Sequence, residues 1–221
     1  MNRILALWRS TIGKKVAMAV SGFLLLLFLI SHVISNLTVL IDPRHLDDYA
    51  AWLRTLGPLL WIARGGLLAL AVIHIVAAVQ LTQMARAARP VSYSKRENQV
   101  ATYAARTMRW GGLLLAVFVV YHLLHLTFGT VHPNFQHGRV GDNLIVGLSS
   151  PAVAIFYAVS MLVLGLHFWH GTWSVFQTIG ANHPAWNRSR NTIAIIITLL
   201  VAGGFLLIPI SALLGVFAWA R

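Results

Sequence analysis

Six histidines stand inside long apolar stretches of the chain, where an ionisable side chain is costly and usually has a partner. The first two stretches carry one each, His32 and His74, and the next two carry two each, three residues apart. The latter are His122 with His125 and His167 with His170. An imidazole can bind a metal, relay a proton or form hydrogen bonds within a packed interior. Which of these chemistries applies depends on how the elements that carry the histidines pair them in space.

The composition of the chain is that of a membrane protein. Of its 221 residues 58% are hydrophobic and 10% are charged, and the mean hydropathy is +0.74. About 20 apolar residues in a helix cross the ~30 Å hydrocarbon core of a bilayer, and five runs are long enough. We therefore expect an all-α integral membrane protein with a single domain over residues 1–221. The predicted transmembrane helices cover about residues 16–40, 58–84, 108–129, 151–178 and 192–219.

The formal net charge of +12 does not indicate a nucleic-acid partner, because the basic residues stand at the ends of the apolar runs and not along one helix face. With a cytoplasmic N-terminus, twelve of the 17 basic residues fall on the cytoplasmic side. They are Arg3, Arg9, Lys14, Lys15, Arg86, Arg89, Lys95, Arg96, Arg106, Arg109, Arg188 and Arg190. This asymmetry predicts that the N-terminus lies inside and the C-terminus outside.

This orientation gives each histidine a depth in the membrane. At about 1.5 Å per residue, His32 lies in the outer half of its span and His74 in the inner half. The same arithmetic places the two histidines of the third span in the outer half and those of the fourth span in the inner half. Two haems with two axial imidazoles each would need such depth-matched pairs on different helices. We expect the first four helices to form a haem-holding bundle, with the fifth helix, which has no histidine, packed on its outside.

Four pieces of the sequence closely resemble the cytochrome b membrane-anchor subunit of succinate dehydrogenase and fumarate reductase, in its single-chain, five-helix, two-haem form. They are STIGKKVAMAVSGFLLLLFLISHVISNL, AVIHIVAAVQL, VYHLLHLTFG and LHFWHGTWSVFQTIG. The most specific parts are GKKxxMAxxGxxLxxFxxxH and HGxWSxFQTxG, and the resemblance covers nearly the whole chain.

The resemblance implies a function and a set of partners. The chain would anchor a flavoprotein subunit and an iron–sulfur subunit at the cytoplasmic face of the cell's inner membrane. It would carry electrons between the iron–sulfur subunit and quinone, usually menaquinone in such proteins, within succinate:quinone oxidoreductase (complex II). The dicarboxylate site would lie on the flavoprotein, because this chain has no soluble domain to hold it. Membrane lipid is a further expected partner and nucleic acid is not.

Carried over residue by residue, the resemblance also implies the ligands of two haem b groups. The family's third-helix ligand follows an aromatic-rich run, as His122 does, and its fourth-helix ligand precedes F-x-x-G-x-W-S, as His167 does. The outer haem would thus be held by His32 and His122, and the inner haem by His74 and His167. The candidate contacts to a haem propionate or to quinone are His125, His170, Lys14, Lys15 and Ser174. An ordinary packing or interfacial role is the alternative for each of these five residues.

Two other classes of protein fit parts of the pattern. A cytochrome b subunit of the hydrogenase or formate dehydrogenase type would also be basic, helical and rich in histidine. A transporter with a histidine-based proton relay would be colourless and would favour broken helices or repeated halves, which the sequence does not show.

The connecting segments carry fewer signals. We expect a short interfacial helix within residues 41–57, which mix aromatic and leucine side chains with charges. The four remaining histidines are expected to be solvated in these segments. They are His45, His132, His137 and His183.

Overall fold

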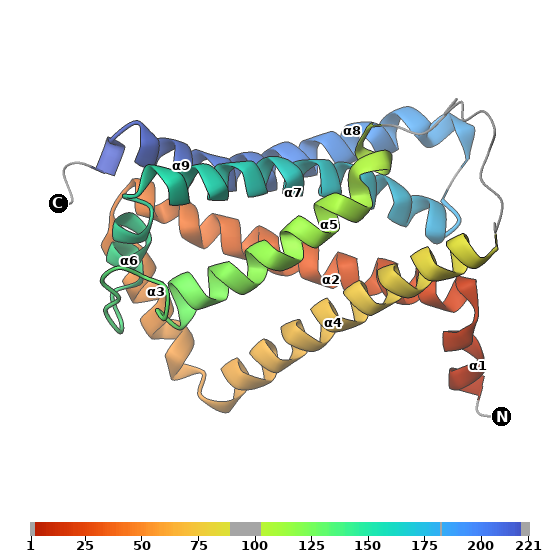
Figure 1. Ribbon diagram of the computed structural model, residues 1–221, viewed down its shortest axis with the longest axis horizontal. Helices are drawn as coiled ribbons and strands as arrows, with labels where there is room; N and C mark the ends of the chain where they lie inside the picture. Colours follow the sequence, from red (N-terminus) through yellow and green to blue (C-terminus); the bar gives the residue numbers. More distant parts are fainter. Residues whose placement is uncertain (1–2, 89–102, 182, 218–221) are drawn as a thin grey trace.

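The computed structural model describes residues 3–88, 103–181 and 183–217, and every regular element in these ranges is a helix (Figure 1). Five helical runs are long and apolar enough to cross a membrane, which confirms the predicted number within the described ranges and indicates a multi-pass membrane protein. The runs are Thr11–Leu40, Pro58–Ala87, Tyr103–Thr127, Pro151–Thr178 and Pro184–Leu213.

Two of these runs are single helices, α4 (Pro58–Ala87) and α7 (Pro151–Thr178), and the other three combine an α-helix with 3-10 or π-helical turns or with a further helix. The first part of the chain forms α1 (Arg3–Arg9), α2 (Thr11–Leu37), the 3-10 turn η1 (Thr38–Leu40), α3 (Pro43–Thr55) and α4 (Pro58–Ala87). The middle part forms α5 (Tyr103–His122), the π-helical turn η2 (Leu123–Thr127), α6 (Val140–Gly147) and α7 (Pro151–Thr178). The last part forms the 3-10 turn η3 (Pro184–Trp186), α8 (Asn187–Thr198), the π-helical turn η4 (Leu199–Gly203) and α9 (Gly204–Leu213).

Helix caps explain where two of these elements begin. The first span starts at Thr11, earlier than predicted, because the Ser10 hydroxyl accepts a hydrogen bond from the Gly13 N–H at 2.9 Å. The expected short helix between the first two spans is α3, where the Asp42 carboxylate accepts from the Arg44 N–H at 2.9 Å. The Arg44 guanidinium hydrogen bonds to the same carboxylate and holds the pKa of Asp42 below its ordinary value.

The last span is displaced from its prediction. It covers Pro184–Leu213 rather than residues 192–219. It begins earlier because Pro184 starts the turn η3, which leads directly into α8. The backbone leaves the helix after Leu213, where Gly215 adopts a positive φ of 72°, a conformation that glycine reaches without the steric cost of a side chain. Residues 218–221 lie outside the described part of the chain.

The four histidine-bearing helices form two closely packed pairs. α2 packs along α4, and α5 packs along α7. Within each pair a short helix at the same end of the bundle joins the two long ones, α3 in the first pair and α6 in the second (Figure 1). We call α2–α3–α4 the first half and α5–α6–α7 the second half. The chain thus contains two helical hairpins of similar construction, each contiguous in sequence.

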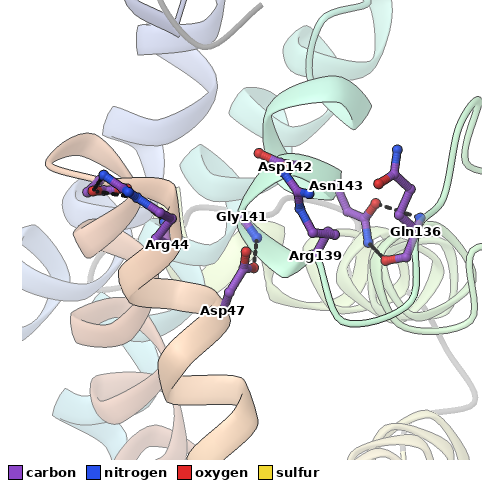
Figure 2. Close-up of polar contacts among 8 residues, drawn as sticks. Arg44, Asp47, Gln136, Arg139, Gly141, Asp142 and Asn143 are labelled. Carbon is purple, nitrogen blue, oxygen red and sulfur yellow. Dashed lines mark hydrogen bonds and ion pairs between the residues drawn. The ribbon is translucent and has the colours of Figure 1, made fainter.

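The end of the bundle that carries α3 and α6, which we call the capped end, is held by polar contacts (Figure 2). The Gly141 N–H in α6 donates to Asp47 Oδ1 in α3 at 2.8 Å. Only a glycine fits at position 141, because a Cβ would collide with the Pro43 carbonyl. Asn143 closes the preceding segment onto α6, accepting from the Gln136 N–H at 2.9 Å and donating to its carbonyl at 2.7 Å.

The fifth span packs on α7 and, through η4 and α9, also on α2. Gly204 allows the close approach to α2, because a Cβ there would lie 2.8 Å from Val33 Cγ2. The next residue, Phe205, lies against His32 with a ring-centroid distance of 5.6 Å. The fifth span therefore lies alongside the histidine-bearing helices and also forms part of the surroundings of one histidine, which the sequence did not predict.

Candidate haem-binding histidine pairs

The first histidine pair lies toward the capped end. His32 is on α2, five residues before that helix ends, and His122 is the last residue of α5. Their ring centroids are 6.1 Å apart and their planes are inclined at 87°. The ring that meets His32 is that of His122, not that of His125, whose ring contacts are with tyrosines and with His132.

The second pair lies nearer the end that carries α1. His74 stands sixteen residues after Pro58, the first residue of α4, and His167 stands sixteen residues after Pro151, the first residue of α7. Their ring centroids are also 6.1 Å apart, with planes inclined at 60°. Each pair therefore joins the first half of the bundle to the second, and the two pairs lie at different levels.

Both separations fit a metal bound between two imidazoles. With metal–nitrogen bonds of roughly 2 Å and roughly 1 Å from each nitrogen to its ring centre, two imidazoles on opposite sides of one metal have centroids roughly 6 Å apart. A haem iron needs only two such ligands from the protein, because the porphyrin supplies the others. All four rings are half-buried. Neither α2 and α5 nor α4 and α7 pack closely along their length, and a histidine ring from each helix lies across the space between them.

Contacts from α2 orient His74. Its Nδ1 lies 3.1 Å from the Met18 carbonyl oxygen and 3.4 Å from Ser21 Oγ. Because a carbonyl can only accept, Nδ1 carries the proton, which leaves the Nε2 lone pair available to a metal. Gly22 makes room for the ring, because a Cβ at that position would lie 2.9 Å from His74 Cε1. A glycine in the middle of an apolar helix was the sequence signal for this approach, but nothing in the sequence named its partner.

The other ring of the second pair, His167, and two further candidate residues are on α7. Nδ1 of His167 is buried and has no hydrogen-bond partner among the described residues. His170 and Ser174 follow on the same helix and are half-buried. Unlike His74, His167 is therefore not fixed in one tautomer by a hydrogen bond within the described chain.

Aromatic rings surround the first pair. His32 stacks on Phe28 with centroids 5.2 Å apart, and His122 lies against Phe118 at 5.7 Å. The Asn36 amide nitrogen is 3.3 Å from His32 Nδ1, but it also donates to the His32 carbonyl at 2.7 Å. Because an amide nitrogen carries two N–H groups, it can donate to both acceptors. Binding of a metal at Nε2 of His32, which places the ring proton on Nδ1, would therefore require the longer contact to break.

The ring of His125 makes no contact with that of His32 within the described residues. The His125 side chain is 1% exposed, and its Nδ1 lies 2.9 Å from the Tyr157 hydroxyl. The sequence predicted that it shares a helix face with His122, as residues three apart do in an α-helix. The π-helical turn η2 begins after His122 and contains His125, and both rings reach the hydroxyl of Tyr157.

His132 is a correction to the expectation that the loop histidines are solvated. It is half-buried, and its Nε2 donates to the Asn143 carbonyl at 2.8 Å. Its ring centroid is 5.1 Å from that of His125. The other three histidines of the connecting segments are exposed as expected, namely His45, which lies in the short helix α3, and His137 and His183.

The two lysines of the GKK motif differ in their surroundings. Lys14 is 6% exposed, donates to the Trp8 carbonyl at 2.5 Å and lies over the Trp8 ring. Gly13 allows α1 to cross here, because a Cβ would collide with the Leu7 carbonyl. The Lys14 ammonium therefore fastens α1 to α2, whereas Lys15 is exposed.

No family model and no curated protein matches this sequence, and no solved structure matches its fold. The fold and the site define a class of protein: a multi-pass helical membrane protein in which two histidine pairs join two helical hairpins.

Proposed function

We propose that this chain is a di-haem cytochrome b that anchors a succinate:quinone oxidoreductase in the membrane. His32 and His122 would hold one haem b, and His74 and His167 would hold the other. The observation that carries the proposal is the 6.1 Å centroid separation found in both pairs. When bound, the haems supply one-electron carriers between the iron–sulfur subunit and quinone.

The choice of this family rests on the sequence motifs, and the contacts made by the motif residues support it. In GKKxxMAxxGxxLxxFxxxH, Gly13 and Lys14 form the junction of α1 with α2. Met18 accepts from the His74 Nδ1–H, and Gly22 makes room for that ring. The residues that the motif specifies therefore include two that position the proposed ligand His74 and two that join α1 to α2, and not only residues of an apolar helix face.

The task of the chain's own residues is to hold four neutral imidazoles at fixed positions in hydrocarbon. The Met18 carbonyl holds the proton of His74 on Nδ1, so that Nε2 is free to bind. Phe28 lies against the ring of His32 and Phe118 against that of His122, which limits how far these two rings can rotate. Half-buried His170 and Ser174 and exposed Lys15 remain candidates for a propionate or quinone contact.

In this proposal the α1 end faces the cytoplasm, where the flavoprotein and iron–sulfur subunits dock, and the capped end faces outward. The uneven distribution of basic residues supports this orientation. The chain has no cysteine, so single cysteines report their side of the membrane. We expect an impermeant thiol reagent to label His137→Cys in intact cells and to label Ala185→Cys only after lysis. The reverse pattern would contradict the orientation.

The haem proposal is tested by a pyridine haemochrome count and reduced-minus-oxidised spectra of the purified chain. We expect two b haems per chain. His32→Ala and His122→Ala should lose the same haem, His74→Ala and His167→Ala the other. His45→Ala, which changes an exposed histidine, is the matched control and should keep both. A colourless wild-type chain, purified under conditions that retain haem, would contradict the proposal.

The family assignment has a separate test. Purification from native membranes should bring a flavoprotein and an iron–sulfur protein with succinate:quinone activity. Copurification of a nickel or molybdenum protein would instead assign the chain to a hydrogenase or formate dehydrogenase type of complex, with the haem ligands unchanged.

A further inference from the structure

The hydroxyl of Tyr157 lies between two histidines of the second half. It is 2.9 Å from Nδ1 of His125 and 3.5 Å from Nδ1 of His122. Tyr157 belongs to α7 and is 6% exposed. The contact is therefore buried and connects the helix that carries His167 to the helix that carries His122.

The direction of these hydrogen bonds depends on what binds His122. A hydroxyl has one proton, so Tyr157 can donate to only one of the two rings. When Nε2 of His122 binds a metal, Nδ1 carries the ring proton and can only donate. Tyr157 then accepts from His122 and donates to His125. In the opposite direction, Tyr157 donates to His122, whose Nε2 then carries the proton and cannot bind.

The surroundings of His125 make the two directions unequal in energy. Its Nε2 is buried and has no hydrogen-bond partner among the described residues. The space beside it is tight, because a Cβ at Gly147 would lie 2.8 Å from that nitrogen. When Tyr157 donates to Nδ1, the neutral His125 ring carries its proton on Nε2, and this donor stays unpaired. Metal binding at His122 must offset the cost of that unpaired donor.

We propose that Tyr157 is the positioning residue of His122, holding the Nδ1–H so that Nε2 faces His32. This inference rests on the proposed function, because it takes His122 as a haem ligand. A hydrogen-bond acceptor at the distal nitrogen makes an imidazole ligand more basic and fixes the orientation of its ring. The Tyr157 hydroxyl therefore accepts from the Nδ1–H of His122, as the Met18 backbone carbonyl accepts from the Nδ1–H of His74.

The test is Tyr157→Phe, which keeps the ring and removes only the hydroxyl. We expect the midpoint potential of the haem at His32 and His122 to rise, because a less basic ligand stabilises the ferric state less. The ferric-to-ferrous ratio of that haem at a fixed potential should fall roughly two- to tenfold, the effect of one ordinary hydrogen bond. Its low-spin electron paramagnetic resonance signal should move as well, and the other haem should be unchanged.

Tyr121→Phe is the matched control. Tyr121 belongs to the same aromatic cluster, with its ring centroid 6.2 Å from that of Tyr157. Within the described residues its hydroxyl forms no hydrogen bond to a histidine, and its ring stacks on His125. This control should leave both potentials in place.

The remaining outcomes separate this inference from the proposed function. Loss of only the first pair's haem from Tyr157→Phe, with both retained in Tyr121→Phe, also supports a positioning role. Two haems with unchanged potentials and signals in Tyr157→Phe overturn the inference and leave the proposed function intact. Loss of both haems, or an equal shift in Tyr121→Phe, indicates a merely structural role and overturns it. A colourless wild-type chain overturns the proposed function and the inference with it.

Discussion

The two histidine pairs have the same centroid separation but are held by different means. Around His74 the contacts come from the backbone of α2, through the Met18 carbonyl and the space left by Gly22. Around His32 and His122 they come from aromatic side chains and a tyrosine hydroxyl. Substitution cannot remove a backbone carbonyl, but it can add atoms beside it. The second pair should therefore be sensitive to added bulk, and the first pair to removed side chains.

The largest effect is expected from Gly22→Val. The new Cβ would lie 2.9 Å from His74 Cε1 and 3.2 Å from its Nδ1, so the ring must move away from the Met18 carbonyl. Loss of such an orienting contact costs about 10- to 100-fold in metal affinity, and we expect the second pair to lose its haem while the first pair keeps its own. Haem content and reduced-minus-oxidised spectra measure this.

Gly112→Val is the control, because a Cβ at that position in α5 meets no atom within 4 Å. It should retain both haems. If Gly22→Val also retained both with unchanged spectra, the close approach of α2 to His74 would not be a requirement of the site.

A smaller effect, at the first pair and not at the second, is expected from Phe205→Leu, which removes the ring beside His32. Aromatic pairs contribute about 0.5–1.5 kcal/mol beyond the area they bury, so haem affinity at the first pair should fall roughly two- to tenfold. Titration of apoprotein with haem measures the affinity of each site. Phe23→Leu, on the exposed part of α2, should change neither site, and an equal loss from both variants would remove the special role of Phe205.

Asp47→Ala should act on the first pair only indirectly. It removes the acceptor of the Gly141 N–H and so separates α3 from α6 (Figure 2). The loss of one such bond costs about 1–2 kcal/mol, and it should appear as faster amide hydrogen exchange in α6. Both haems should remain bound at room temperature. On heating, the first pair's haem should be released at a lower temperature than in the wild-type chain. The exposed neighbour Asp48→Ala is the control, and unaltered exchange in Asp47→Ala would show that the capped end is held by other contacts.

The smallest effect is expected from Ser21→Ala. Ser21 Oγ lies 3.4 Å from His74 Nδ1, but it donates to the Ala17 carbonyl at 2.7 Å, and the Met18 carbonyl is closer to the ring. The midpoint potential of the second pair's haem should therefore hardly change. At a fixed potential its ferric-to-ferrous ratio should change by less than about twofold, the lower limit for one hydrogen bond. A change as large as that of Gly22→Val would identify the hydroxyl, and not the carbonyl, as the orienting group.

The number of spans was predictable because it depends on local composition and on the fixed rise of a helix. The same rise predicted which histidines share a level, and the structure places His32 beside His122 and His74 beside His167. What the pattern alone left open was the choice between His122 and His125. In the structure the ring that meets His32 is that of His122. His125 lies in the π-helical turn η2, and apolar periodicity does not reveal such a turn.

The contacts that come from distant parts of the chain were not predictable. Phe205 reaches His32 from the fifth span, and Tyr157 reaches His122 from α7. The burial of His132 requires α6 to present its Asn143 carbonyl. Lys14 is a basic residue at a span end, and only the crossing of α1 over Gly13 explains why it is buried.

The division into two hairpins has a consequence for biogenesis. Each half is one contiguous stretch of chain whose two long helices pack against each other, so the first can enter the membrane and form its hairpin while the second is still being synthesised. Each histidine pair takes one ring from each half, so neither pair exists until the second hairpin has docked on the first. If the pairs hold haem as proposed, the cofactor can be bound only at the end of maturation, and a cell short of haem would accumulate a chain whose two hairpins are inserted in the membrane but not joined through the histidines.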